Sequence, residues 1–163
     1  MRRFPDTLAT SLKRFSLVWV NRLTAGKEPW AVRRRKSPLD EPTKILYVQT
    51  SGVEAPERSA TVFFLSTAAA SMDIEVGIYF TQFGPTLLEK GKAEQLRIKK
   101  GSVGQTLRHF IDQALDVGVK FYVCQPSLDL NDLKMEQLID GVTMIGGAAF
   151  NDMALEANQV ICF

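Results

Sequence analysis

The sequence contains few of the residues from which catalytic and metal sites are usually built. Among its 163 residues there are two cysteines, Cys124 and Cys162, and one histidine, His109. Two cysteines cannot form a disulfide framework, and no CxxC pair or Cys/His cluster indicates zinc. No carboxylate pair stands out, and neither GxGxxG nor GxxxxGK[ST] occurs. We therefore expect no metal and no cofactor.

Long apolar runs are also missing. No stretch approaches the roughly 20 residues that span a bilayer, and the apolar run Phe15–Val20 is too short for a secretory signal. Hydrophobic residues make up 45% of the chain, which is ordinary for a soluble globular protein. Free thiols and five methionines suit a reducing compartment. We expect a cytoplasmic protein, with membrane association through its N-terminal part left open.

Acidic residues are scarce in the first part of the chain. Residues 1–36 contain two acidic residues and ten Lys and Arg, which gives a net charge of +8. The remaining 127 residues contain sixteen acidic residues and ten Lys and Arg, which gives a net charge of −6. The change falls in RRRKSPLDEPTK (33–44), a stretch typical of an exposed linker. The sequence therefore predicts a basic N-terminal extension over residues 1–43 and an α/β domain over residues 44–163.

The extension has one strong pattern. Its apolar residues recur at spacings of 4, 3, 4 and 4, which predicts one face of an amphipathic helix; they are Leu8, Leu12, Phe15, Trp19 and Leu23. Residues 1–36 could serve as a peripheral membrane helix, as a docking segment for a partner or neighbouring subunit, or as an organelle transit peptide. Docking is the interpretation we favour. Nucleic-acid binding is not expected, because ordered aromatic interleaving and a nucleic-acid-binding fold are missing.

The second part alternates strand-like and helix-like segments. Helices between consecutive short apolar strands predict a parallel sheet covered on both faces, a three-layer α/β sandwich of about five mostly parallel strands. The expected strands are 44–50, 74–80, 119–124, 142–146 and 160–163. The expected helical segments are 56–71, 84–91, 103–118, 132–141 and 148–159, together with a turn at QPSLDL (125–130).

Cys124 is the most interesting candidate for chemistry. It ends the predicted strand 119–124, and in an open parallel sheet ligands and reactive groups lie beyond the carboxyl ends of the strands. The following QPSLDL contains a proline suited to a first helical turn, whose free N–H groups would stabilise a thiolate. A buried, inert cysteine in a strand is equally consistent with this position.

Three other features carry weaker hypotheses. Cys162 lies in the last predicted strand, and we expect it to be buried and inert, although a role as resolving partner of Cys124 stays open. His109 falls outside the apolar stripe of its helix, so Cys–His general-base catalysis has little support. The loop QTSGVEAPE (49–57) is similar to a flavodoxin-type phosphate loop, but Glu54 and Glu57 would repel a phosphate.

Three segments carry a family resemblance: AAASMDIEVGIYFTQFG, VKFYVCQPSLDL and LIDGVTMIGGAAF. Together they make the chain from about Lys44 to Phe163 resemble the DsrE/DsrF-like family of sulfur-trafficking proteins, in the branch labelled as predicted peroxiredoxins. That branch has a strand, a cysteine, a Ser-hydrophobic-Asp triplet and a Leu-Ile-Asp-Gly-Val segment, in this order. The counterparts are Cys124, Ser127-Leu128-Asp129 and Leu138–Val142.

The resemblance implies that Cys124 carries sulfane sulfur as a persulfide, with Gln125, Ser127 and Asp129 as supporting residues. It also implies a parallel α/β fold, homo-oligomers of three or more subunits, and protein partners, rhodanese- or TusA-like, that donate and accept the sulfur. Some relatives have a second cysteine near the first, and none lies near Cys124, so a one-thiol carrier is expected. The alternatives are a non-catalytic assembly or regulatory module with an unreactive cysteine and, third, a flavin- or nucleotide-binding domain.

Overall fold

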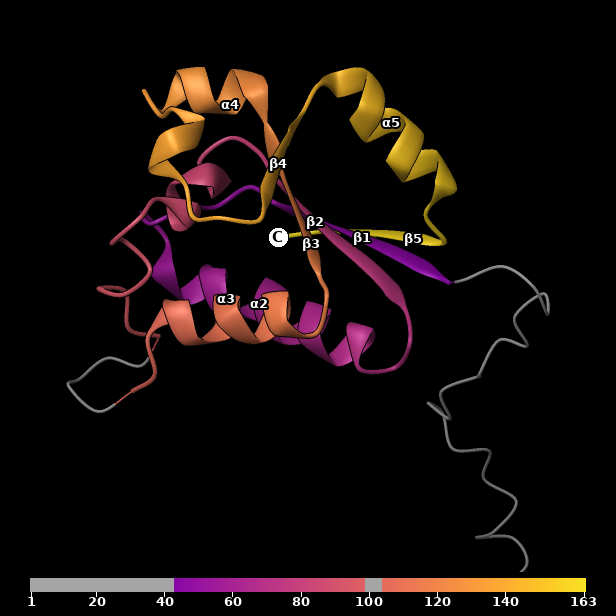
Figure 1. The fold of residues 1–163 in the computed structure, drawn as a ribbon, viewed down its shortest axis with the longest axis horizontal. Coiled ribbons are helices and arrows are strands. Elements are labelled where there is room, and N and C mark those ends of the chain that lie inside the picture. Colours follow the sequence, from indigo (N-terminus) through magenta and orange to yellow (C-terminus); the bar gives the residue numbers. More distant parts are fainter. Residues whose placement is uncertain (1–42, 99–103) are drawn as a thin grey trace, which may run out of the picture. The chain divides into compact units, whose positions relative to one another are not determined.

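The computed structural model describes residues 43–98 and 104–163, which form a five-stranded sheet with helices on both faces (Figure 1). Each strand runs parallel to its neighbours in the order β4-β3-β2-β1-β5. The strands are β1 (Lys44–Gln49), β2 (Glu75–Phe80), β3 (Lys120–Cys124), β4 (Val142–Ile145) and β5 (Gln159–Cys162). The helices are α2 (Pro56–Ala70), α3 (Leu107–Asp116), α4 (Gln125–Leu130) and α5 (Gly147–Glu156), with 3-10 turns η1 (Gly84–Leu88) and η2 (Met135–Gln137).

The helices lie in two layers. Helices α2 and α3 lie side by side under one face of the sheet, and α4 and α5 lie on the opposite side (Figure 1). The predicted three-layer α/β sandwich with a parallel sheet is therefore confirmed. Because side chains alternate along a strand, Val76, Ile78 and Phe80 of β2 face α2 and α3, whereas Gly77 and Tyr79 face α5.

The main core lies between the sheet and the α2/α3 layer. Three aromatic rings from α2, β2 and β3 meet there with centroids 5.4–5.9 Å apart: Phe63, Phe80 and Phe121. All three are essentially inaccessible to solvent. Helix α3 adds Leu107, Ile111 and Ala114 at spacings of four and three. Burial of these rings and aliphatic side chains is the largest favourable contribution to folding.

The opposite face has a smaller core. Among the described residues, only Leu46, Val48 and Tyr79 are buried there, and the side chains of α5 that cover them are themselves partly exposed. The ring of Phe150 in α5 stacks on Tyr79 with centroids 4.4 Å apart. The two layers thus differ: one is a closed core, whereas among the described helices only the ten-residue α5 covers the other.

The predicted helix over residues 132–141 is wrong. Only Met135–Gln137 forms a single 3-10 turn, and the chain after it is extended. Backbone pairing with the segment after η1 is the reason: the Ile139 N–H donates to the Leu88 carbonyl and the Lys90 N–H donates to the Gln137 carbonyl, both at 2.9 Å. Leu138 and Ile139 are buried in this extended form, so tertiary contacts override the local helix pattern.

The other predicted segments agree with the structure to within a few residues, apart from 103–118, whose helix begins only at Leu107. Helix α2 begins at Pro56 as predicted. The helix predicted over 8–23 lies outside the described residues. Among the helices that are described, none has the length and apolar character needed to cross a membrane.

Two adjacent phenylalanines of α2 allow a matched test of this core. Phe63 is fully buried, whereas Phe64 is 64% exposed. We expect Phe63→Ala to lower the free energy of unfolding by about 3–5 kcal/mol, because it removes a ring from the aromatic cluster and leaves a cavity. Phe64→Ala should change it by less than about 0.5 kcal/mol. Urea denaturation followed by circular dichroism measures both, and equal losses in the two variants would contradict the described packing.

Candidate functional site around Cys124

Cys124 is the last residue of β3, an interior strand, and lies at the carboxyl edge of the sheet. It pairs with Ile145 of β4, while the pairing of β3 with β2 ends one residue earlier, at Val123 with Phe80. Helix α4 begins at the next residue, with Pro126 in its first turn as the sequence predicts. The thiol is partly buried and contacts the small core under α5. It is therefore neither a fully buried packing residue nor a freely solvated one.

Three hydroxyl-bearing side chains act on the sulfur. Ser127 in α4, Tyr79 in β2 and Thr81 just after β2 each lower the pKa of the thiol as hydrogen-bonding groups. Burial raises the pKa of the Cys124 thiol, but these hydrogen bonds, with a contribution from the Ser127 backbone N–H, outweigh burial and lower the pKa below its ordinary value. A larger fraction of the sulfur is therefore thiolate at neutral pH, which is the reactive form.

Ser127 is held firmly. Its side chain is buried, and its hydroxyl oxygen accepts a hydrogen bond from the Gln82 backbone N–H at 2.8 Å and lies 3.2 Å from the Thr81 hydroxyl. Of the three predicted supporting residues, Ser127 is the one that the structure brings to the sulfur. Gln125 and Asp129 have exposed side chains on α4.

Tyr79 is a site residue that the sequence analysis missed. It pairs with Tyr122 in register, so Cys124 lies two residues further along the next strand, on the same face. Burial, followed by the hydrogen bond to Cys124, raises the pKa of Tyr79 well above its ordinary value, so its hydroxyl keeps its proton and acts as a donor. The alternation of side chains along β2 predicts that Tyr79 and Phe80 point to opposite faces of the sheet. Only the pairing of β2 with β3 shows that Tyr79 points to the same face as the Cys124 thiol.

The expectation that Cys162 is buried is wrong. Cys162 is exposed because β5 is an edge strand. Its register partner is Val48, which places it on the α5 face like Cys124. Three strand spacings separate β5 from β3, or about 14 Å. A disulfide needs Cα atoms within about 7 Å, so Cys162 cannot act as an intramolecular resolving partner without a large rearrangement.

Other candidates lie away from the thiol. His109 is exposed on α3, which covers the opposite face of the sheet. In the loop resembling a phosphate site, the Glu54 carboxylate accepts the Gly52 N–H at 2.8 Å, and the Val53 N–H donates to the Thr86 hydroxyl at 3.0 Å. Side chains of the loop and of η1 therefore already occupy two of the N–H donors that an anion would need. Within residues 43–98 and 104–163, no group of three or more His, Cys, Asp or Glu could hold a metal ion.

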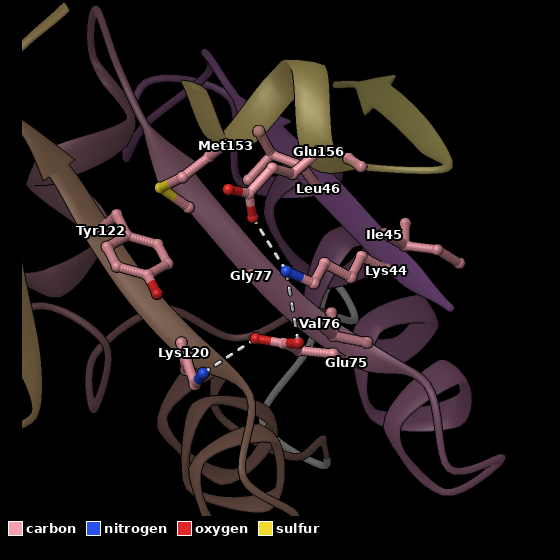
Figure 2. A pocket seen from close by; sticks show the side chains of 11 residues that line it. Lys44, Ile45, Leu46, Glu75, Val76, Gly77, Lys120, Tyr122, Met153 and Glu156 are labelled. Carbon is pink, nitrogen blue, oxygen red and sulfur yellow. Dashed lines mark hydrogen bonds and ion pairs between the residues drawn. The ribbon is translucent and has the colours of Figure 1, made fainter. Parts of the chain in front are cut away.

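A pocket of about 190 Å³ lies at the amino-terminal edge of the sheet, away from Cys124 (Figure 2). Its charged residues pair with one another: Lys44 with Glu156 at 2.9 Å, and Lys120 with Glu75 at 3.0 Å. The hydrogen bond from Lys120 lowers the pKa of the exposed Glu75 carboxyl. These ion pairs link the first residues of β1, β2 and β3 to the end of α5, and we assign them a structural role.

Fold and site together define a class: a parallel α/β protein with a partly buried thiol at the carboxyl end of an interior strand, whose pKa is lowered by hydroxyl groups. The chain belongs to the DsrE/DsrF-like family, which matches residues 43–163. It is 22% identical over 118 residues to the uncharacterized protein MJ0760 of Methanocaldococcus jannaschii, covering 72% of this chain. The match spans 42% of that relative, so this chain corresponds to less than half of its length.

Two solved structures share the fold. The YchN protein of E. coli superposes with a TM-score of 0.62 at 18% identity, covering 74% of this chain and 99% of YchN. MTH1491 of Methanobacterium thermoautotrophicum, a protein of unknown function, superposes with a TM-score of 0.50 at 11% identity, covering 76% of this chain and 100% of MTH1491. At these identities the similarity concerns the fold.

The donors around Cys124 make a testable prediction about its titration. In Cys162→Ser, Cys124 is the remaining thiol, and its alkylation by iodoacetamide should rise with pH around a midpoint lower than that of N-acetylcysteine, because the lowered pKa yields thiolate at lower pH. Ser127→Ala should move the midpoint to higher pH and reduce the thiolate fraction at neutral pH about tenfold, the usual effect of losing one hydrogen bond to a charged group.

Ser71→Ala provides the control, because it removes an exposed hydroxyl that bonds the Thr67 carbonyl at the far end of α2. It should leave the midpoint unchanged. A midpoint at or above that of N-acetylcysteine in Cys162→Ser would show that burial dominates over the hydrogen bonds.

Proposed function

We propose that the protein is a sulfur carrier that holds sulfane sulfur as a persulfide on Cys124. Membership of the DsrE/DsrF-like family is consistent with a sulfur-related function. The observation that carries the proposal is the set of hydrogen bonds from Ser127, Tyr79 and Thr81 that lowers the pKa of a partly buried thiol. Such an arrangement stabilises a thiolate while leaving the sulfur within reach of another molecule.

The loading step is a thiolate exchange on sulfur. The Cys124 thiolate attacks the outer sulfur of a donor persulfide, R–S–SH, forming a new S–S bond while the donor's S–S bond breaks. The products are Cys124–S–SH and R–S⁻, which takes up a proton from solvent. The outer sulfur moves with its hydrogen, and no external oxidant or reductant is consumed. The step needs a thiolate and an accessible sulfur, but neither a general base nor a metal.

The unloading step uses the same donors. An acceptor thiolate attacks the outer sulfur of Cys124–S–SH, and the Cys124 sulfur now leaves with the electron pair of the broken bond. A thiol of lower pKa is a better leaving group, so the hydroxyls of Ser127, Tyr79 and Thr81 stabilise Cys124 in both directions. We propose this reversibility as the reason why the site contains donors and no base.

The partners in this proposal are protein thiols. Rhodanese- or TusA-like proteins, which the family resemblance implies, would supply and remove the sulfur. The rim beside Cys124 consists of small exposed residues, Gly146, Gly147 and Ala148, which follow its neighbour Ile145. Because these residues have little or no side chain, the end of a partner's chain or loop could approach the partly buried sulfur. The compartment we propose is the cytoplasm, where thiols stay reduced.

Residues 1–36 have a proposed role of their own. Their net charge of +8 contrasts with −6 for the rest of the chain. We propose that they dock on a partner protein or a neighbouring subunit, since opposite charges favour encounter between such surfaces.

We also propose that the chain forms a homo-oligomer through the α5 side of the sheet. A ten-residue helix in a closed core buries its apolar stripe, yet Phe150, Met153 and Ala154 stay partly exposed. Leu155 is 85% exposed and Val160 on β5 is 42% exposed. A second copy covering this side would bury these residues, which favours association. This observation also supports the alternative function, an assembly module whose Cys124 is unreactive.

The oligomer proposal predicts the effect of a charge on this side. We expect Leu155→Glu to shift the sedimenting species toward the monomer, because an interfacial carboxylate would lose its hydration. Phe64→Glu is the matched control, since Phe64 is also largely exposed, at 64%, but lies on α2, across the sheet. Analytical ultracentrifugation measures both. A monomeric parent protein, or dissociation by Phe64→Glu alone, would rule out the α5 side as the interface.

Sulfur loading is the direct test of the proposed function. After incubation with polysulfide, the intact mass should increase by one sulfur atom in the parent protein and in Cys162→Ser, but not in Cys124→Ser. The added sulfur should disappear on treatment with dithiothreitol. Loading that persists in Cys124→Ser would assign the sulfur to another group, and absence of loading in every variant would leave the assembly module as the better function.

A further inference from the structure

Asn131, directly after α4, connects that helix to the loop after β2. Its amide nitrogen donates to the Ser127 carbonyl at 2.6 Å and to the Gln82 carbonyl at 2.7 Å. Both neighbours are carbonyl oxygens, which can only accept, so the nitrogen and not the oxygen of the amide must face them. Asn131 is partly buried, and neither hydrogen bond belongs to regular secondary structure.

The residue that Asn131 holds has an unusual backbone. Gln82 has φ of 53°, in the left-handed region that residues with a side chain seldom adopt. Its N–H donates to the Ser127 hydroxyl at 2.8 Å and its carbonyl accepts from Asn131. Strained conformations of this kind persist where the surroundings over-determine them. Here one donor and one acceptor fix the two peptide groups on either side of Gln82.

This arrangement directs a hydroxyl hydrogen toward the sulfur. A serine hydroxyl has one hydrogen and two acceptor lone pairs. The Gln82 N–H occupies one lone pair of Ser127, and the Thr81 hydroxyl lies at 3.2 Å. Two hydroxyls that bond each other use one of their two hydrogens, so the other stays available for Cys124, the thiol whose pKa both side chains lower. If Gln82 turned, Ser127 would lose the contact that fixes its oxygen.

We propose that Asn131 is a positioning residue for the Cys124 sulfur: by holding the carbonyls of Gln82 and Ser127, it keeps the Gln82 N–H on the Ser127 hydroxyl and that hydroxyl on the sulfur. Asn131 does not touch the sulfur itself. The inference deepens the proposed function. It rests on that function only for what the thiolate is used for, because the positioning of the donor can be measured without any sulfur donor molecule.

The experiment compares two asparagines in a Cys162→Ser background. Asn131→Leu keeps a similar volume and removes both donors. Asn158→Leu is the matched control, since the Asn158 amide oxygen accepts the Lys44 N–H at 2.6 Å at the other edge of the sheet. Thiolate formation is followed by its ultraviolet absorbance during a pH titration, with the Cys124→Ser, Cys162→Ser protein subtracted as the baseline. Tyr79, the other titratable group that bonds the sulfur, does not interfere, because its raised pKa keeps it protonated through the range of the thiol.

We expect Asn131→Leu to shift the midpoint to higher pH and to reduce the thiolate fraction at neutral pH about three- to tenfold, because the orientation of one donor to a charged group is lost. Asn158→Leu should leave the midpoint unchanged even if it costs as much stability. Asn131→Ser keeps a single donor and is expected to give a smaller shift of the midpoint in the same direction. It also serves as a second variant if Asn131→Leu does not fold.

An unchanged midpoint in whichever Asn131 variant folds, judged by near-ultraviolet circular dichroism, would overturn the proposal and leave Asn131 as a structural link only. A shifted midpoint together with failed sulfur loading would keep the positioning role and remove the sulfur-carrier function. Failure of the two proposals is therefore distinguishable.

Discussion

Parallel pairing of β2 with β3 sets the chemistry of the thiol. In the observed register Tyr79 lies beside Tyr122, so the side chains of Tyr79 and Cys124 point to the same face at the carboxyl edge. A slip of one residue would turn one of them to the opposite face. The ring cluster of Phe63, Phe80 and Phe121 lies on that opposite face and is packed in this register. The closed core therefore fixes the position of donors on the side that is open to a partner.

Two opposing effects act on the Cys124 sulfur, and their balance decides its reactivity. Burial alone would raise the pKa of the thiol and make it a packing residue, which is why strand cysteines are usually inert. The hydroxyl donors reverse this, and each of them is an uncharged side chain. Neutral donors stabilise the thiolate as nucleophile and as leaving group alike. The proposed sulfur exchange would therefore use the same donors in both directions.

Sequence patterns predicted the elements that depend on local signals. The strand ending at Cys124, the turn begun by Pro126 and the start of α2 at Pro56 follow from apolar runs and proline positions. The failures depend on contacts between distant segments. Residues 138–139 are extended because they pair with residues 88–90, and Cys162 is exposed because its strand lies at the edge of the sheet. Tyr79 and Asn131 were not predicted as site residues. Tyr79 is 45 residues away from Cys124 in the sequence, and Asn131 acts on the thiol only through Ser127.

Comparison of the two cysteines shows that position in the sheet decides what a thiol can do. Both lie near the carboxyl ends of parallel strands, and both side chains point to the α5 face. Cys124 has a strand on each side and a helix that begins at the next residue, so β2 and α4 supply its donors. Cys162 lies on an outer strand with one neighbouring strand and stays exposed. An interior strand gives a thiol two flanks from which hydroxyls can reach it, whereas an edge strand gives it one.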